Sequence, residues 1–189
     1  MKITHIEPVV VRVNHRGDWV FVLVHTDAGL TGLGEASHNT NDRMALASIA
    51  QYSEALAGED PTRIQALWHR MAKRYDGRVA HTVVSAIEQA LWDILGQSLG
   101  VPIRTLLGGA VRERIRLYAN INRHVRDRAP AGFARAAEQA VAQGFAAIKL
   151  APFDEVRSAD QPRTGPRAGW RAGVERVRAV RAAIGDEVE

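Results

Sequence analysis

Apolar and polar residues alternate along the first 36 residues, the pattern typical of half-buried strands. Two alternating runs, Ile3–Val13 and Trp19–Thr26, are separated by a polar turn at Asn14–Gly17, and the run Leu30–Ala36 follows a second turn at Asp27–Gly29. Strands joined by short turns of this composition pair in antiparallel fashion. The pattern therefore predicts a three-stranded antiparallel meander.

The next stretch changes to the three- and four-residue spacing of amphipathic helices. We expect helices over about 41–56, 60–77 and 81–100, the first capped by Asn41 or Asp42 and the second opened by Asp60-Pro61 and ended by Gly77. A meander followed by helices is typical of the α+β class.

Beyond Pro102 and the Gly108-Gly109 pair, strand and helix patterns alternate, with expected strands at 115–121 and 145–150 and expected helices at 130–143 and 173–184. Strand and helix in alternation require a parallel sheet. We therefore place a domain boundary between 1–112 and 113–189.

The composition, 46% hydrophobic and 24% charged, is that of a soluble globular protein. Its longest apolar runs are far shorter than the ~20 residues of a membrane span, and no basic-then-apolar leader opens the chain. We expect a cytoplasmic protein without a membrane partner. The absence of cysteine excludes disulfides and thiolate metal sites.

The formal net charge of +4 and the pI of 9.9 raise the question of nucleic-acid binding. The arginines are scattered singly and lack interleaved aromatic residues, so we expect no nucleic-acid partner. Lysine occurs only as Lys2, Lys73 and Lys149, which makes Lys149 notable in its predicted strand.

Three segments, Leu30–Ala36, Ser85–Gly96 and Leu99–Gly109, occur in the order and at the spacing of motifs in a known protein family. The chain resembles the capping domain of the mandelate racemase/muconate-lactonizing group of the enolase superfamily. Its later strands resemble the start of that group's modified TIM barrel. The resemblance implies an α+β capping domain followed by the first βα units of an incomplete TIM-like (β/α) barrel.

The resemblance also implies a chemistry: abstraction of a proton α to a carboxylate, with Mg²⁺ stabilising the enediolate. The second barrel strand of such enzymes ends in Lys-x-Lys. Lys149 matches the first lysine and is the catalytic candidate, as an electrostatic clamp or a base, whereas Ala151 stands at the second. A methyl group transfers no proton, which favours an acid-sugar dehydratase over a racemase, epimerase or cycloisomerase. A non-catalytic binding or assembly module is the third hypothesis.

Candidate substrate-binding residues follow from the same resemblance. His15 and Arg16 flank a turn that resembles a substrate-covering loop, and His38 lies in a stretch that resembles a second such loop. Asn120 and Asn122 follow the first barrel strand. The expected substrate is a small carboxylic acid or acid sugar, and the expected assembly is a homo-oligomer.

Metal ligands are not expected within this chain. In the family they lie at the ends of the third to fifth barrel strands, while 113–189 provides two of eight βα units of ~30 residues. Asp154 and Glu155 are adjacent loop carboxylates, which do not converge on a hard cation from different elements. The other five histidines lack the helical two-His spacing of a metal site and are interpreted as structural or surface residues: His5, His25, His69, His81 and His124. We expect Mg²⁺ only in the full-length enzyme and no catalysis by 1–189 alone.

Overall fold

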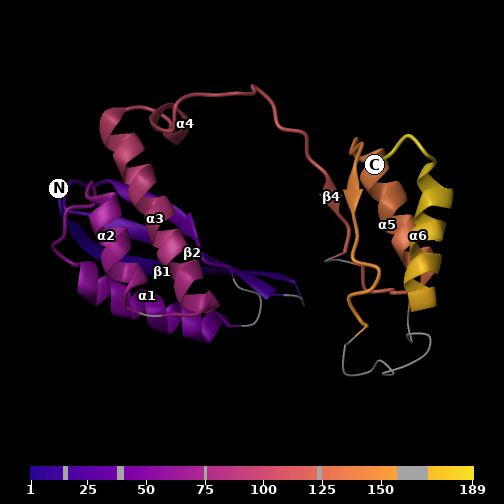
Figure 1. Ribbon diagram of the computed structural model, residues 1–189, viewed down its shortest axis with the longest axis horizontal. Helices are drawn as coiled ribbons and strands as arrows, with labels where there is room; N and C mark the ends of the chain where they lie inside the picture. The colour runs from indigo at the N-terminus through magenta and orange to yellow at the C-terminus, as the bar shows by residue number, and fades with distance from the viewer. Residues whose placement is uncertain (15–16, 38–40, 75, 123–124, 157–169) are drawn as a thin grey trace. The chain divides into compact units, whose positions relative to one another are not determined.

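The computed structural model describes residues 1–189 except 15–16, 38–40, 75, 123–124 and 157–169 (Figure 1). Two compact units, Met1–Val111 and Arg112–Glu189, make up the chain. Among the described residues, no helix has the length and apolar character needed to cross a membrane.

The first unit contains the expected antiparallel meander. Its strands β1 (Ile3–Asn14), β2 (Gly17–Thr26) and β3 (Thr31–Glu35) lie in the order β1-β2-β3. Along β2, Val20, Val22 and Val24 are fully buried while the residues between them are partly or largely exposed. The sheet therefore has one face in the core and one face toward solvent.

Four helices follow the meander: α1 (Asp42–Leu56), α2 (Ile64–Ala72), α3 (Arg78–Leu99) and the short α4 (Ile103–Leu106), which the pattern had not indicated. Asn41 occupies the N-cap position of α1, but its side chain makes no capping hydrogen bond. Gly100, with φ of 68°, ends α3 in the left-handed region that glycine adopts without strain.

The expected start of the second helix at Asp60 was wrong. The Asp60 carboxylate accepts hydrogen bonds from the Thr62 amide at 2.9 Å and the Thr62 hydroxyl at 2.7 Å, which closes a local turn instead of a helix. The helix begins only at Ile64 and ends at Ala72. Gly77 precedes α3 and does not end α2.

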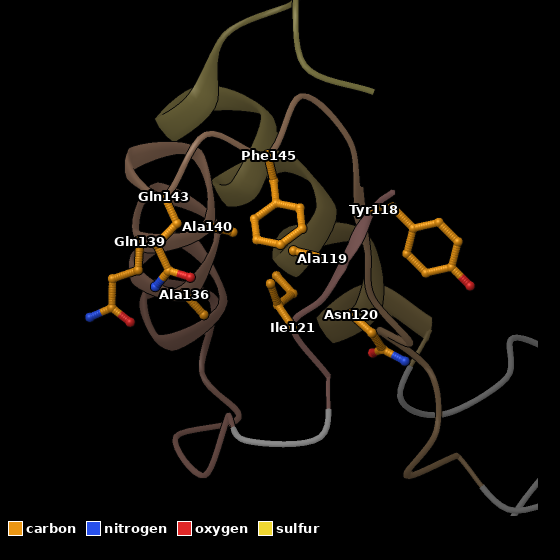
Figure 2. A pocket seen from close by; sticks show the side chains of 9 residues that line it. All are labelled: Tyr118, Ala119, Asn120, Ile121, Ala136, Gln139, Ala140, Gln143 and Phe145. Atoms are coloured by element: carbon orange, nitrogen blue, oxygen red, sulfur yellow. The ribbon is translucent and has the colours of Figure 1, made fainter. Parts of the chain in front are cut away.

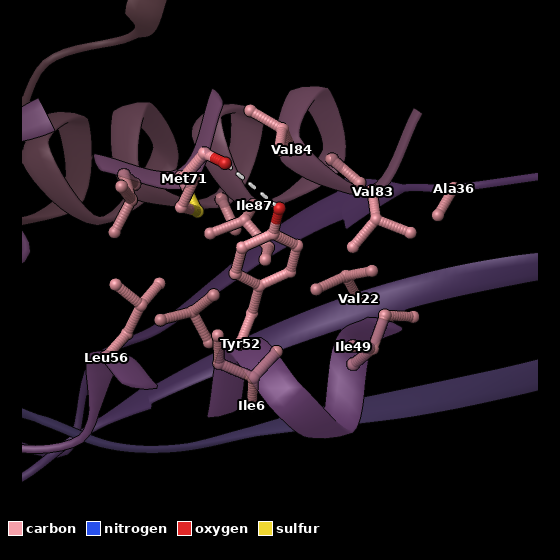
Figure 3. Close-up of a cluster of buried hydrophobic side chains, with 14 of the residues drawn as sticks. Ile6, Val22, Ala36, Ile49, Tyr52, Leu56, Met71, Val83, Val84 and Ile87 are labelled. Carbon is pink, nitrogen blue, oxygen red and sulfur yellow. Dashed lines mark hydrogen bonds between the residues drawn. The ribbon is translucent and has the colours of Figure 1, made fainter. Parts of the chain in front are cut away.

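The core of the first unit lies between the buried face of the sheet and the helices (Figure 3). At its centre Tyr52 is 1% exposed and donates a 3.1 Å hydrogen bond to the carbonyl of Met71, so the phenol joins α1 to α2. Around it pack Ile6, Val22, Ile49, Leu56, Val83, Val84 and Ile87.

Helix α3 meets strand β3 backbone to backbone. A Cβ atom placed on Gly34 would lie 1.9 Å from the carbonyl oxygen of Ala86, and one on Gly32 would lie 2.0 Å from that of Ala90. Asp93 accepts a 2.9 Å hydrogen bond from the amide of Leu33, between the two glycines. This hydrogen bond ties α3 to β3.

The second unit is a parallel α/β arrangement. Strands β4 (Ala119–Asn120) and β5 (Ile148–Lys149) pair in parallel, and α5 (Pro130–Ala142) and α6 (Trp170–Ile184) pack on each other beside them. Their shared core contains Ile121, Val125, Phe133, Ala136, Ala137, Ala140 and Val180.

Both expected strands of this unit proved shorter than the pattern indicated. Ile115 and Leu117 are 79% and 69% exposed, and in the described chain β4 has a partner only at Ala119–Asn120. On the other side of β5, Ile148 donates to the carbonyl of Glu189 at 2.7 Å, and Glu189 donates to that of Ala146 at 3.1 Å. These two hydrogen bonds place Glu189 beside residues 146–148, in the pattern of a parallel pair.

Candidate functional site

The candidate site lies where β4 and β5 end, and alternation along the strands decides which side chains face it. Ala119 and Ile148 pack toward the helices, whereas the next residues, Asn120 and Lys149, are exposed on the opposite face. In a closed (β/α) barrel the face away from the helices lines the interior. Lys149 therefore stands on the face that would line the interior of such a barrel.

The ammonium of Lys149 lies over an aromatic ring. Its Nζ is 5.5 Å from the centroid of Tyr118, a residue 53% exposed at the start of β4. A cation above a ring face gains a modest electrostatic attraction. The charge stays accessible to an anionic ligand above this face.

Asn120 and Asn122 differ in what their amides do. The Asn120 Oδ1 accepts a 3.2 Å hydrogen bond from the backbone amide of Asn122. The side chain of Asn122 accepts from Arg128 Nη1 at 3.0 Å and donates to Asp154 Oδ2 at 3.0 Å. Asn122 is thus engaged within the protein at both ends of its amide, while Asn120 keeps its exposed position beside Lys149.

Two arginines hold the loop that follows β5, residues 151–156, here called the β5 loop. Arg128, just before α5, pairs with Asp154, donates from Nε to Glu155 at 2.6 Å and reaches the carbonyl of Ala151 at 3.3 Å. Its guanidinium lies 4.5 Å from the centroid of the Phe133 ring. The nitrogen atoms of a single guanidinium group, that of Arg128, therefore attach the β5 loop to the segment just before α5.

Arg176 fixes the same loop from α6. It is 7% exposed and donates three 2.7 Å hydrogen bonds, to the carbonyls of Arg128 and Pro152 and to Oε2 of Glu155. The hydrogen bond from Arg176, followed by that from Arg128, holds the pKa of the Glu155 carboxyl below its usual value despite partial desolvation. The two arginines and two carboxylates form one neutralised network.

This network decides whether the β5 loop could hold a metal ion. Asp154 and Glu155 are paired with guanidinium groups that lie where a cation would sit, so they do not fit a Mg²⁺ site. Among the residues that the structure describes, the sole cluster of three His, Asp or Glu ligands is His5, Glu7 and His25, in the first unit. The described part of the second unit therefore supplies no magnesium site.

Three substrate-binding candidates, His15, Arg16 and His38, lie outside the described residues. The arginine network was missed from the sequence, although one signal was present. Gly173, Arg176 and Val180 recur at three- and four-residue spacing, so Arg176 stands within the buried stripe of α6. An arginine in such a stripe requires buried acceptors.

A hollow in the second unit runs along β4 beside α5, where Ile121 and Phe145 face Ala136 and Ala140, while Tyr118 and Asn120 point away from α5 (Figure 2). Its lining is mixed, because Asn120, Gln139 and Gln143 also border it. In the described chain β4 is an edge strand at this place.

Comparison with known proteins identifies the family. The model of the mandelate racemase / muconate lactonizing enzyme N-terminal domain matches residues 2–108. A D-galactonate dehydratase of Verminephrobacter eiseniae is 38% identical over 174 residues, which are 90% of this chain and 43% of that protein. This chain spans less than half the length of that relative.

Solved structures agree over the whole chain. A Mesorhizobium loti protein named provisionally as a dehydratase is 37% identical, with a TM-score of 0.86 over 100% of this chain and 52% of its own. An enolase from Agrobacterium radiobacter, with bound Na and L-malate, is 30% identical with a TM-score of 0.77 over 100% of this chain and 47% of its own. The two units of the present chain therefore correspond to a capping domain and the start of a barrel. The chain belongs to the mandelate racemase/muconate lactonizing enzyme family of the enolase superfamily.

Proposed function

We propose that residues 1–189 form the N-terminal part of a Mg²⁺-dependent acid-sugar dehydratase. The observation that carries this proposal is the position of Lys149, at the end of β5 and on the face opposite the helices. The similarity to a D-galactonate dehydratase over 90% of the chain supports the substrate class. The L-malate bound to the Agrobacterium radiobacter enolase, a small hydroxy acid, is consistent with it.

Lys149 would act on the carboxylate end of the substrate. When a base removes the α proton, negative charge moves onto the carboxylate oxygens, and a fixed ammonium stabilises that charge more than the starting state. The β hydroxyl then leaves as water after accepting a proton, and the resulting enol becomes a 2-keto acid. Ala151 has no group for either proton transfer, so we propose that the base and the acid come from other strands.

The arginine network would serve this chemistry indirectly. Arg128 and Arg176 bind the carbonyls of Ala151 and Pro152, which lie two and three residues beyond Lys149. A fixed loop keeps the backbone of Lys149 in one position relative to the bound acid. We propose that both arginines are positioning residues.

The metal ligands are proposed to lie outside residues 1–189, because the carboxylates of the β5 loop are paired with arginines. When bound, the metal would supply charge stabilisation to the enediolate. We accordingly propose that this chain has no dehydratase activity by itself. His15, Arg16, His38 and Asn120 remain proposed substrate contacts, and the homo-oligomeric, cytoplasmic state remains a proposal.

A chimera tests the function. This chain would replace the matching N-terminal segment of the Verminephrobacter eiseniae D-galactonate dehydratase, and D-galactonate and other acid sugars would be assayed with Mg²⁺ for a 2-keto product. We expect dehydration by the chimera and none by the chain alone. Exchange and inversion at the α carbon without loss of water would instead support a racemase or epimerase.

A folded chimera without activity on any acid sugar would contradict the proposal. Folding is checked independently by circular dichroism and by a cooperative thermal transition. The unmodified relative, assayed in parallel, verifies that the second half is competent.

A further inference from the structure

We propose that His5, Glu7 and His25 form a binding site for a zinc-class divalent cation on the solvent face of the first unit's sheet. His5 and Glu7 are two residues apart on β1 and point to the same face, and His25 lies opposite His5 on β2. One ligand atom of each residue lies within 4.8 Å of the other two. Pairing between strands, not spacing along a helix, brings these groups together.

The ligand set favours a particular class of metal. Two imidazoles and one carboxylate are the donors of three-ligand zinc sites, with a fourth position left to water. Mg²⁺ prefers an octahedron of oxygen ligands and would bind poorly to these imidazoles. The proposed site is therefore separate in place and in chemistry from the magnesium expected of the family.

The surrounding hydroxyls prepare both rings for coordination. The Nδ1 atom of His25 lies 3.1 Å from the hydroxyl of Thr31, and that of His5 lies 3.1 Å from the hydroxyl of Thr4. A ring that donates from Nδ1 to such an oxygen presents the lone pair of Nε2 to a metal. Each histidine therefore has a hydroxyl oxygen beside Nδ1 that would accept the Nδ1 proton's hydrogen bond once Nε2 binds a metal.

The existing contact between His25 and Glu7 shows where the ion would enter. Their Nε2 and Oε2 atoms are 2.9 Å apart, a distance bridged by one proton. A Zn²⁺ ion that replaced this proton would have bonds of about 2.0–2.2 Å to the two atoms. Glu7 is 50% exposed and His25 25% exposed at the side chain, so the ion reaches the site from solvent.

Coordination requires a small rearrangement of the rings. The imidazoles of His5 and His25 are stacked, with centroids 4.3 Å apart and planes 9° from parallel. Ligand atoms around a tetrahedral zinc ion are about 3.3 Å apart, so the atoms must approach and the rings must turn out of the stack. Exposed side chains make such rotations on the picosecond to nanosecond scale.

The test is a titration of the full chain, prepared without a histidine affinity tag and stripped with chelator. Zn²⁺ binding is measured by calorimetry, and Co²⁺ is used as a visible-absorption probe of tetrahedral coordination. We expect the wild type to bind a single Zn²⁺, with no competition from excess Mg²⁺. Thr31→Val, which keeps all three ligands, should weaken binding by ~10- to 100-fold.

Substitution of the ligands completes the test. His5→Gln and His25→Gln should each weaken Zn²⁺ binding by at least about tenfold and remove the Co²⁺ band. His69→Gln is the matched control, because His69 is an exposed histidine on α2 that contacts Trp68. Absence of saturable binding by the wild type, or unchanged affinity in His5→Gln or His25→Gln, would overturn the proposal. If either variant fails to fold, Thr31→Val with unchanged affinity overturns it.

Discussion

Arg176 on α6 donates a 2.7 Å hydrogen bond to Glu155 in the β5 loop. The arginine is 7% exposed, and the same guanidinium also donates to two backbone carbonyls. A buried cation is tolerated only when its donors are matched in this way. The pair therefore connects the stability of the second unit to the position of the strand end that carries Lys149.

Replacement of Arg176 by methionine should lower the free energy of unfolding of the second unit by about 3 kcal/mol. Methionine keeps apolar contact with Phe133, but the carbonyls of Arg128 and Pro152 lose this donor and Glu155 keeps only its pairing with Arg128. Amide hydrogen exchange of α5 and α6 measures the loss. Arg178→Met is the control, since Arg178 is 72% exposed and its substitution should change stability by less than about 0.5 kcal/mol.

The second unit should lose stability in acid, with Glu155 as one cause. Its pKa in the folded chain is below the ordinary 4.5, chiefly through the hydrogen bond from Arg176, so the unfolded chain binds the proton more tightly. The stabilisation is therefore present above pH 4.5 and lost as pH falls through the lower, folded value. Denaturant midpoints between pH 7 and pH 3 should show a weaker dependence in Glu155→Gln. Glu175→Gln, which removes an exposed carboxylate outside the arginine network, is the control.

Gly34→Ala should destabilise the first unit by about 3 kcal/mol or more. The new Cβ would lie 1.9 Å from the carbonyl oxygen of Ala86, and this clash is relieved only if the backbone of β3 or α3 moves. Thermal unfolding followed by circular dichroism gives the measurement. Leu33→Ala provides the comparison on the same strand, since that side chain is 50% exposed on the opposite face. Equal losses in the two variants would contradict the close-contact argument.

Tyr52→Phe should cost the first unit about 1 kcal/mol. The ring and its packing are retained, while the carbonyl of Met71 loses the hydrogen bond that joins α2 to α1. Urea unfolding of the wild type and the variant provides the value. An unchanged midpoint would show that the hydroxyl adds nothing beyond its ring.

Lys149→Met in the chimeric dehydratase should lower kcat by about 100-fold or more, because a fixed positive charge near the developing enediolate is removed. Lys73→Met, at an exposed position after α2, controls for the loss of a lysine elsewhere. Dehydration of an acid sugar is the assay. An unaltered kcat in Lys149→Met would remove Lys149 from the mechanism.

Hydrophobic periodicity predicted most helices and strands of the first unit, because each of them shows the spacing of apolar residues typical of its type. The alternation in β2 and the apolar stripe of α3 are set by the same core, so each could be recognised without the other. Asp60 misled the prediction because its carboxylate closes a turn with Thr62, and turn and helix N-terminus share the same residue types.

The candidate site could be predicted only in part. Lys149 was singled out because it matches a family motif at the end of a predicted strand, and its catalytic role stays a prediction. Arg128 was not found, because its partner Asp154 is 26 residues away in the sequence. Hydrophobic periodicity detects only neighbours within one helix or strand. The cluster of His5, Glu7 and His25 depends on strand register, which a search for helical spacing does not test.

The glycines of β3 have a further consequence for how the first unit folds. Gly32 and Gly34 point toward α3, while Leu33 between them points outward. A slip of β3 by one residue would drive the leucine side chain into the helix backbone, so that misaligned pairing is blocked by sterics and not merely less favourable. The two missing side chains thus select a single alignment of β3 in the sheet.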